Sequence, residues 1–275
     1  MSVPPWPRPD ISLRKTGTMG RARAVLRMAI LGCVLAVLLP LMMLTRLIER
    51  MLGGQTRPIS PYVTQAFFRA CLGVMNIRVE IAGAPMDLPG AVVGNHASWL
   101  DILVLNARHR VFFVSKSEVA GWPVIGFLAR LSGTLFIRRD AREARAQTAA
   151  LETRLAAGQT LLFFPEGTST DGLRVLPFKA TLFQAFFAPA LGRAVHIQPV
   201  SVIYEAPEGA DPAFYGWFGA MEFAPHFAAV LAARRRGTAR LVYHAPLRVA
   251  DYADRKTLAK DAETAVRSAI PPGHS

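Results

Sequence analysis

Apolar and polar positions alternate along most of the chain with two different periods. Short apolar or alternating runs of strand length recur after residue 76, and they predict strands that are buried on one or both faces. The segments between these runs have helical spacing, most clearly at residues 140–157. This pattern predicts an α/β fold, with a mostly parallel twisted sheet flanked by helices on both faces. The predicted strands are residues 77–82, 91–94, 111–115, 134–137, 161–164, 194–203 and 240–249.

The first quarter of the chain has a different pattern. Residues 28–44 form an uncharged apolar run of 17 residues, which is about 25 Å long as a helix and at the short end of what crosses a bilayer. Six basic residues precede the run, Arg46 and Arg50 follow it, and a small-residue cleavage site is absent from the sequence. We therefore expect an uncleaved hydrophobic membrane anchor rather than a secretory signal.

Composition agrees with contact with lipid. Of the 275 residues, 52% are hydrophobic and the mean hydropathy is +0.27, which exceeds ordinary soluble usage. The formal net charge of +13 fits either nucleic acid or an anionic membrane surface. No nucleic-acid-binding motif accompanies this charge, so we expect no nucleic-acid partner. The two cysteines, Cys33 and Cys71, lie in apolar stretches and support neither a disulfide framework nor a zinc site.

A histidine and a carboxylate follow one of the predicted strands. His96 and Asp101 come directly after residues 91–94, where a strand gives way to a helix and where α/β proteins place their chemistry. If the helix begins just after His96, Asp101 lies about one turn in and can reach the imidazole; on one unbroken helix the two would point roughly 140° apart. A carboxylate on one ring nitrogen stabilises the imidazolium, so the other nitrogen can take a proton from a hydroxyl group. In isolation, such a pair is more often only a helix cap.

A second carboxylate stands in a similar position. Residues 160–164 are typical of a buried strand, and Pro165, Glu166, Gly167 and Thr168 interrupt it. We therefore expect Glu166 at the carboxyl end of a central strand, beside the region that His96 faces. A plain strand-ending turn would explain the proline and the glycine alone.

Together these residues resemble the glycerolipid acyltransferase family typified by 1-acylglycerol-3-phosphate (lysophosphatidic acid) acyltransferase. The resemblance covers about residues 77–203 and rests on four blocks in the family's order. They are N-H-x4-D at residues 95–101, a close match to G-x-x-F-I-D-R at 133–139, F-P-E-G-T at 164–168, and a close match to V-x-P-V at 197–200. The resemblance implies a membrane O-acyltransferase that moves a fatty acyl group from an acyl carrier protein or coenzyme A thioester to the free hydroxyl of a lysolipid. No cofactor is expected beyond this co-substrate, and no metal ion.

The resemblance also implies roles for the matched residues. His96, oriented by Asp101, is expected to remove the proton from the acceptor hydroxyl, whose oxygen attacks the thioester carbonyl. Arg139 offers a planar fork for a phosphate or carboxylate in the lipid head group. The expected acceptor-binding residues are Lys116, Arg139, Glu166, Gly167 and Thr168, and the residues expected on the acyl-donor side are Pro199 and Val200.

Three positions depart from the family pattern. Arg138 replaces an acidic residue of the second block, Ser169 replaces the arginine that usually follows E-G-T, and Thr181 replaces a common glycine. The family arginine at the Ser169 position is usually assigned to the phosphate of the acceptor, so its absence disfavours lysophosphatidic acid. The branch that acylates lyso-ornithine lipid is the closer match at residues 171–179, 214–218 and 221–226.

The implied chemistry constrains the anchor. A single span with six basic residues on its amino side would leave the N-terminus in the cytosol and carry the catalytic domain outside, away from cytosolic acyl thioesters. A helical hairpin that turns near residues 53–61 and returns over 62–75 resolves the conflict, and one spanning helix is the alternative. We expect attachment to the cytoplasmic face of the inner (plasma) membrane. The expected divisions are a basic disordered N-terminus (1–23), a hydrophobic hairpin anchor (24–76), an acyltransferase domain (77–270) and a tail (271–275).

Two other classes of protein remain open. A lipid hydrolase would share the anchor and the His-Asp pair, but it needs a nucleophile elbow or a metal site, and the sequence has neither motif. A non-catalytic lipid-binding protein would tolerate loss of His96 or Asp101, and both are present. Release of free thiol from an acyl thioester, dependent on added lysolipid, separates these classes.

Overall fold

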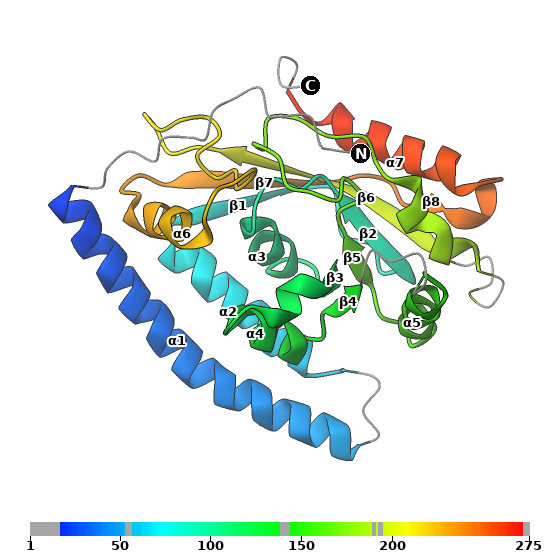
Figure 1. Cartoon of the computed structure of the whole chain (residues 1–275), viewed down its shortest axis with the longest axis horizontal. Helices are drawn as coiled ribbons and strands as arrows, with labels where there is room; N and C mark the ends of the chain where they lie inside the picture. Colours follow the sequence, from blue (N-terminus) through cyan, green and yellow to red (C-terminus); the bar gives the residue numbers. More distant parts are fainter. Residues whose placement is uncertain (1–16, 53–56, 138–143, 189–190, 192–194, 272–275) are drawn as a thin grey trace.

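The computed structural model describes residues 17–52, 57–137, 144–188, 191 and 195–271, and the described residues are built around one eight-stranded sheet (Figure 1). The strands follow the order β1-β7-β6-β2-β5-β3-β4, and β8 pairs with β6. They are β1 (Ile77–Ala82), β2 (Gly90–Gly94), β3 (Phe112–Lys116), β4 (Leu135–Ile137), β5 (Leu161–Phe163), β6 (His196–Glu205), β7 (Gly237–Tyr243) and β8 (Leu247–Arg248).

Most neighbouring strands are parallel, which confirms the predicted fold class. β2 pairs in parallel with β5 on one side and with β6 on the other, and β3 continues the parallel sheet to β4. β6 pairs with both β7 and β8 in antiparallel fashion. The prediction of one strand over residues 240–249 is wrong, because the chain breaks into β7 and β8 around Pro246. Proline lacks the N–H that a continuous ladder would require.

Helices cover both faces of the sheet. One face carries α2 (Ser60–Val74), α3 (Leu100–Asn106) and α6 (Phe223–Ala232), with α1 (Thr18–Met51) and α4 (Ile125–Ser132) outside them. The other face carries α5 (Ala144–Ala156), α7 (Arg255–Ser268) and the 3-10 helix η3 (Ala180–Phe187). Two short 3-10 helices, η1 (Ser117–Gly121) and η5 (Val249–Asp251), follow β3 and β8.

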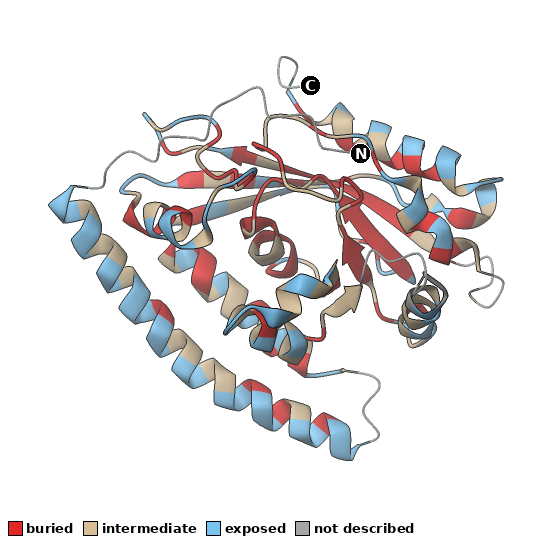
Figure 2. Cartoon of the chain, viewed as in Figure 1, coloured by how far each residue is buried: buried red, intermediate tan, exposed pale blue. Residues whose placement is uncertain are grey.

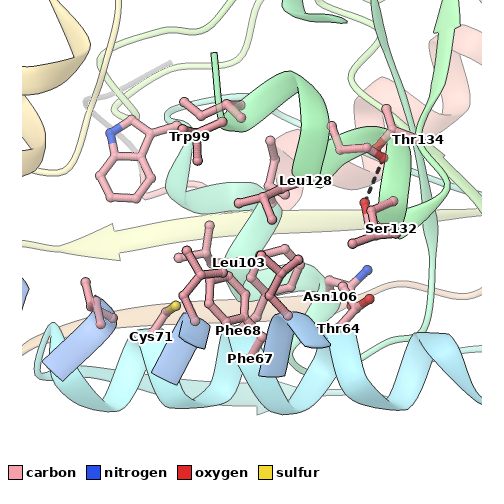
Figure 3. A pocket seen from close by; sticks show the side chains of 18 of the residues that line it. Thr64, Phe67, Phe68, Cys71, Trp99, Leu103, Asn106, Leu128, Ser132 and Thr134 are labelled. Carbon is pink, nitrogen blue, oxygen red and sulfur yellow. Dashed lines mark hydrogen bonds between the residues drawn. The ribbon is translucent and has the colours of Figure 1, made fainter. Parts of the chain in front are cut away.

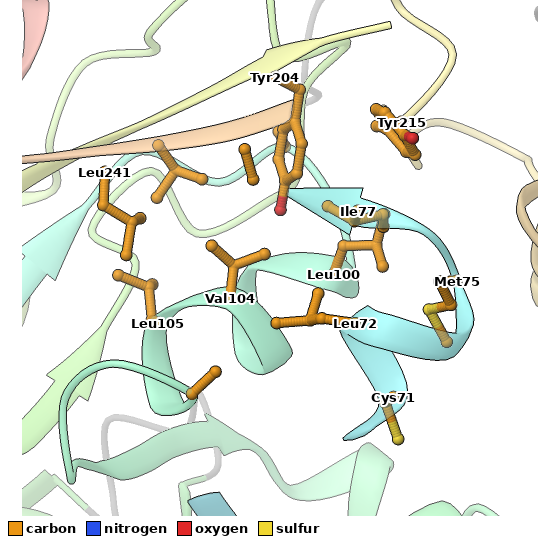
Figure 4. Close-up of a cluster of buried hydrophobic side chains, with 14 of the residues drawn as sticks. Cys71, Leu72, Met75, Ile77, Leu100, Val104, Leu105, Tyr204, Tyr215 and Leu241 are labelled. Carbon is orange, nitrogen blue, oxygen red and sulfur yellow. The ribbon is translucent and has the colours of Figure 1, made fainter. Parts of the chain in front are cut away.

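The side chains on the two faces of β2 belong to two separate apolar cores. Val92 belongs to the core beneath α3, which Figure 4 shows around Leu100 and Val104. Ala91 and Val93 belong to the opposite core, with side chains of α7 and η3. Successive side chains of a strand point to opposite faces, so a fully apolar run such as residues 91–93 fits only a strand covered on both sides. Burial on both faces holds the end of β2 in place, and the loop that carries His96 follows directly.

The N-terminal helix is longer than the apolar run predicted. α1 begins at Thr18, inside the segment expected to be disordered, and continues through Pro40 to Met51. By length and composition α1 could cross a membrane. A signal sequence near the N-terminus would have the same length and composition. Its outer face exposes apolar side chains along most of its length (Figure 2). α2 lies at the position predicted for the return arm and packs against α1, α3 and β1.

Candidate active site

The candidate site lies where β2 ends and α3 begins. β2 ends at Gly94. The side chain of the next residue, Asn95, forms hydrogen bonds with the backbone of β6. The Asn95 amide donates to the Val202 carbonyl at 2.9 Å and accepts from the Val202 N–H at 2.8 Å. Asn95 is fully buried, so this reciprocal pair holds the following loop against the sheet. His96 is therefore presented from an anchored backbone.

The structure brings His96 and Asp101 together as the sequence predicts. Nδ1 of His96 lies 2.7 Å from Oδ2 of Asp101, and the same oxygen accepts the backbone N–H groups of Ala97 at 2.8 Å and Ser98 at 3.0 Å. Asp101 therefore both orients the imidazole and fixes the backbone of the loop that leads into α3. The Asp101 side chain is fully buried, whereas the His96 side chain keeps 21% of its surface exposed. With Nδ1 bound to the carboxylate, Nε2 is the nitrogen that can accept a proton from a substrate.

A buried tyrosine completes the set of donors to Asp101. Tyr204 on β6 donates its hydroxyl to Oδ1 of Asp101 at 2.7 Å, and Figure 4 shows its hydroxyl directed toward α3. Burial, and then the charge of Asp101, raises the pKa of Tyr204 well above its usual value, so the phenol stays a donor. Tyr204 was not predicted from the sequence. Val200, Val202 and Tyr204 occupy alternate positions of β6 and share one core, and this two-residue spacing is the signal that could have placed the phenol on the α3 side of the sheet.

The F-P-E-G-T segment, residues 164–168, also contacts His96. The Phe164 ring stacks on the imidazole with centroids 4.2 Å apart and planes 5° from parallel. Glu166 accepts the His96 backbone N–H at 3.1 Å with one oxygen and the Leu176 N–H at 2.9 Å with the other. Phe164 thus supports the ring, and Glu166 ties the His96 loop to the loop before η3.

Glu166 is almost completely buried, with 1% of its surface exposed. Burial raises the pKa of its carboxyl well above the usual value, and the N–H groups of Leu176 and His96 oppose that shift. Because both oxygens accept backbone N–H groups, the geometry assigns Glu166 to holding the loops. Direct contact between Glu166 and an acceptor stays a prediction.

The other predicted site residues fall into three groups. Gly167 and Thr168 are half-buried in the turn after Glu166, and Lys116 ends β3 with an exposed side chain. Pro199 and Val200 are buried in β6, paired with the last residues of β2 beneath the His96 loop, so neither reaches the surface. Arg139 lies outside the described residues. The binding roles of all these residues stay predictions.

A second histidine holds a tryptophan at the start of α3. His226 is fully buried, and burial lowers its pKa. Its Nδ1 accepts from the Trp99 indole at 2.9 Å, and its Nε2 lies 3.2 Å from the Phe214 carbonyl. A neutral ring that accepts at Nδ1 and donates at Nε2 satisfies both contacts. His226 therefore fixes the rotamer of Trp99, which the sequence alone did not indicate.

An apolar cavity of about 710 Å³ lies between α1 and the helices on this face of the sheet. Its wall includes Phe67 and Phe68 of α2, Leu103 of α3, and Trp99 just before α3 (Figure 3). The cavity size and its apolar lining suit an aliphatic chain. α3 also carries Asp101, so the same helix lines the cavity and positions the His96–Asp101 pair.

The chain is similar to known acyltransferases. A family model described as acyltransferase matches residues 76–203. The chain is 52% identical over 274 residues to the lyso-ornithine lipid O-acyltransferase of Rhodobacter capsulatus, covering 98% of each chain. It is 34% identical to the protein of the same description from Pseudomonas aeruginosa, covering 92% of this chain and 95% of the relative.

Similarity to acyltransferases with another acceptor is more restricted. The chain is 39% identical over 121 residues to the 1-acyl-sn-glycerol-3-phosphate acyltransferase of Neisseria meningitidis, covering 42% of this chain and 47% of the relative. The crystal structure of the 1-acyl-sn-glycerophosphate acyltransferase from Thermotoga maritima superposes with a TM-score of 0.60 at 19% identity, covering 91% of this chain and 97% of that one. At this identity the structural match supports the fold alone.

Proposed function

We propose that this chain, which belongs to the acyltransferase family, transfers a fatty acyl group to the free hydroxyl of lyso-ornithine lipid. The observation that carries the proposal is the 52% identity to a lyso-ornithine lipid O-acyltransferase, which extends over 98% of both chains. The site provides the chemistry that such a transfer requires, because His96 is exposed on one side and bonded to a buried carboxylate on the other.

In the proposed reaction His96 acts as a general base. Its Nε2 takes the proton of the lysolipid hydroxyl, the oxygen attacks the thioester carbonyl of the donor, and the thiolate leaves with a proton returned from the imidazolium. Asp101 stabilises that imidazolium through the 2.7 Å contact at Nδ1. No covalent acyl-enzyme is required. Ser98 is fully buried, so a role as hydrolase nucleophile receives no support from its position.

The charge on the E-G-T loop favours an acceptor without a phosphate. Ser169 stands where the family usually has an arginine, and the next arginine along this loop, Arg174, is paired with Asp171 at 2.8 Å. Asp171 is buried, so the pair neutralises the guanidinium within the loop. Lyso-ornithine lipid carries a carboxylate and an ammonium in place of a phosphate, and it requires fewer cations from the protein.

The donor is an acyl carrier protein or coenzyme A thioester, and no further cofactor takes part. The cavity between α1 and α3 is the proposed place for an aliphatic chain, because apolar burial of the chain would compensate for its removal from the bilayer. The acceptor test supplies purified enzyme with each thioester and, separately, lyso-ornithine lipid or lysophosphatidic acid. Thiol release and acylated product should appear with lyso-ornithine lipid. Product from lysophosphatidic acid alone would refute the acceptor assignment and leave the acyltransferase chemistry intact.

The contacts of α1 support attachment to one leaflet. Near its start, Arg27 donates to two backbone carbonyls at the end of α6, each at 2.8 Å. Near its end, Glu49 accepts two N–H groups at the start of α2, each at 2.8 Å. Arg27 and Glu49 are 22 positions apart, which corresponds to about 33 Å of helix, as much as the hydrocarbon core of a bilayer. A spanning helix would separate these ends across the membrane, yet one domain holds both.

We therefore propose that α1 lies along the membrane with its exposed apolar face in the lipid and the catalytic domain on the cytoplasmic side. Single cysteines at Ser2 and Ser275, with Cys33 and Cys71 replaced, should both react with an impermeant reagent from the cytosolic side of sealed vesicles. Labelling from opposite sides would refute this arrangement.

A further inference from the structure

The connection between η1 and α4 exposes large apolar side chains outside the anchor. Trp122 has 39% of its surface exposed, Val124 has 63% and Phe127 has 44%. All three lie within the segment 122–127, which we call the α4 tip. Exposed apolar residues scattered singly are common, but a group of large ones within six residues marks a contact surface.

The backbone of the α4 tip is held in place, so this exposure is a built feature of the fold. The Gly126 N–H donates to the Trp122 carbonyl at 2.9 Å, and a Cβ at Gly126 would lie 2.3 Å from the Ala120 carbonyl oxygen. Only glycine allows this close approach. Val124 has φ +61°, a conformation that β-branched residues rarely adopt. The fold therefore keeps Val124 turned outward at a cost to its backbone.

The α4 tip lies beside the anchor helix. α1 and α4 are in contact, and both border the apolar cavity, α1 through Met28 and Gly32 and the α4 tip through Pro123 and Val124. All four of these residues are exposed as well as cavity-lining. The cavity therefore opens between α1 and the α4 tip, and its rim is apolar on both sides. Exposed residues of α1 and of the α4 tip therefore border the same cavity.

We propose that the α4 tip inserts into the same lipid leaflet as α1 and forms the second side of a membrane-facing entrance to the cavity. This inference rests on the attachment through α1 proposed above. A lipid bilayer is the partner that fits, because the exposed side chains are apolar and tryptophan is favoured at the membrane interface. An acyl chain would then pass from the bilayer into the cavity without crossing water.

Depth-dependent fluorescence quenching tests the proposal with the full chain. In a Cys33→Ser, Cys71→Ala background, an environment-sensitive probe is attached to a single cysteine at Phe127, Val37 or Leu88. Leu88 is the matched control, since its exposed fraction of 42% is close to that of Phe127 and it precedes β2 at the amino-terminal edge of the sheet. The proteins are bound to phosphatidylcholine and phosphatidylglycerol vesicles whose acyl chains carry bromine.

The three positions separate the possible outcomes. Quenching at Val37 and Phe127 but not at Leu88 would support the proposal. Quenching at Val37 alone would overturn it and leave the attachment through α1 standing, whereas absence of quenching at Val37 would overturn both. As a second readout, Phe127→Glu should lower acylation of vesicle-embedded lysolipid about tenfold, because a charge replaces a ring that inserts into lipid. The thermal midpoint should not fall, because Phe127 is exposed in the folded protein. Leu88→Glu should retain wild-type activity, and equal loss in both variants would overturn the proposal.

Discussion

Tyr204→Phe removes one hydroxyl from the structure, and its consequence follows from the environment of Asp101. The Asp101 carboxylate is fully buried and receives the Tyr204 hydroxyl at 2.7 Å. A hydrogen bond to a buried charge contributes about 1.5 to 3 kcal/mol, so the free energy of unfolding should fall by about that amount. The bond is present before and after proton transfer to His96. Most of its energy therefore cancels in the rate, and we expect kcat to fall only about threefold to tenfold with KM little changed.

A matched variant distinguishes positioning from simple structural damage. Tyr215→Phe is the control, because Tyr215 is also buried and its hydroxyl interacts with the backbone of Gly237 instead of Asp101. This control should keep kcat close to the wild-type value, since the lost hydroxyl does not contact Asp101. An equal loss of kcat in both variants, or a loss in Tyr204→Phe as large as that of His96→Ala, would refute the reasoning.

Three further substitutions test the site and the fold. His96→Ala should lower kcat by about 10² to 10⁴-fold with the thermal midpoint preserved, and wild-type turnover in a folded variant would exclude the general base. Asp101→Asn should be nearly as harmful, because the amide cannot stabilise the imidazolium; full activity would show that the 2.7 Å contact is not used. Burial lowers the pKa of His109 from 6.5 to about 4, so the unfolded chain binds a proton more readily between these values and stability should fall as the pH drops through them. His109→Phe should flatten this part of the urea midpoint profile, and an unchanged slope would contradict the assignment.

The parts of the fold that were predictable depend on neighbours in sequence. Residues 91–94 had to form a strand covered on both faces, because every residue in the run is apolar. The loop chemistry of His96 and Asp101 follows from their five-residue spacing at a strand end. Pro246 was also visible in the sequence as a residue that cannot donate to a ladder, but the strand predicted over residues 240–249 ran through it. Errors of this kind occur where a local breaker competes with a longer apolar pattern.

The residues that support His96 and Asp101 could not be predicted from local sequence patterns. Tyr204 meets Asp101 across 103 positions of sequence, and its contact depends on the register of β6 against β2. A one-residue shift of that register would turn the phenol to the opposite face of the sheet. Phe164 was recognised as a strand residue and as the first residue of the F-P-E-G-T block, but its stacking on His96 was not predicted. Such contacts are set by strand order, which period and composition do not specify.

Two of the arginines before the apolar run have a structural role that the sequence rule for membrane orientation does not consider. Counting basic residues on the amino side treats them as signals of membrane orientation. In the structure, Arg23 and Arg27 donate to backbone carbonyls at the end of α6 at 2.6 to 2.8 Å. A cation at a helix C-terminus satisfies carbonyls that have no partner within the helix and interacts favourably with its dipole. These two charges therefore hold α1 against the domain, and the count that set the orientation of a single span includes residues with a different physical role.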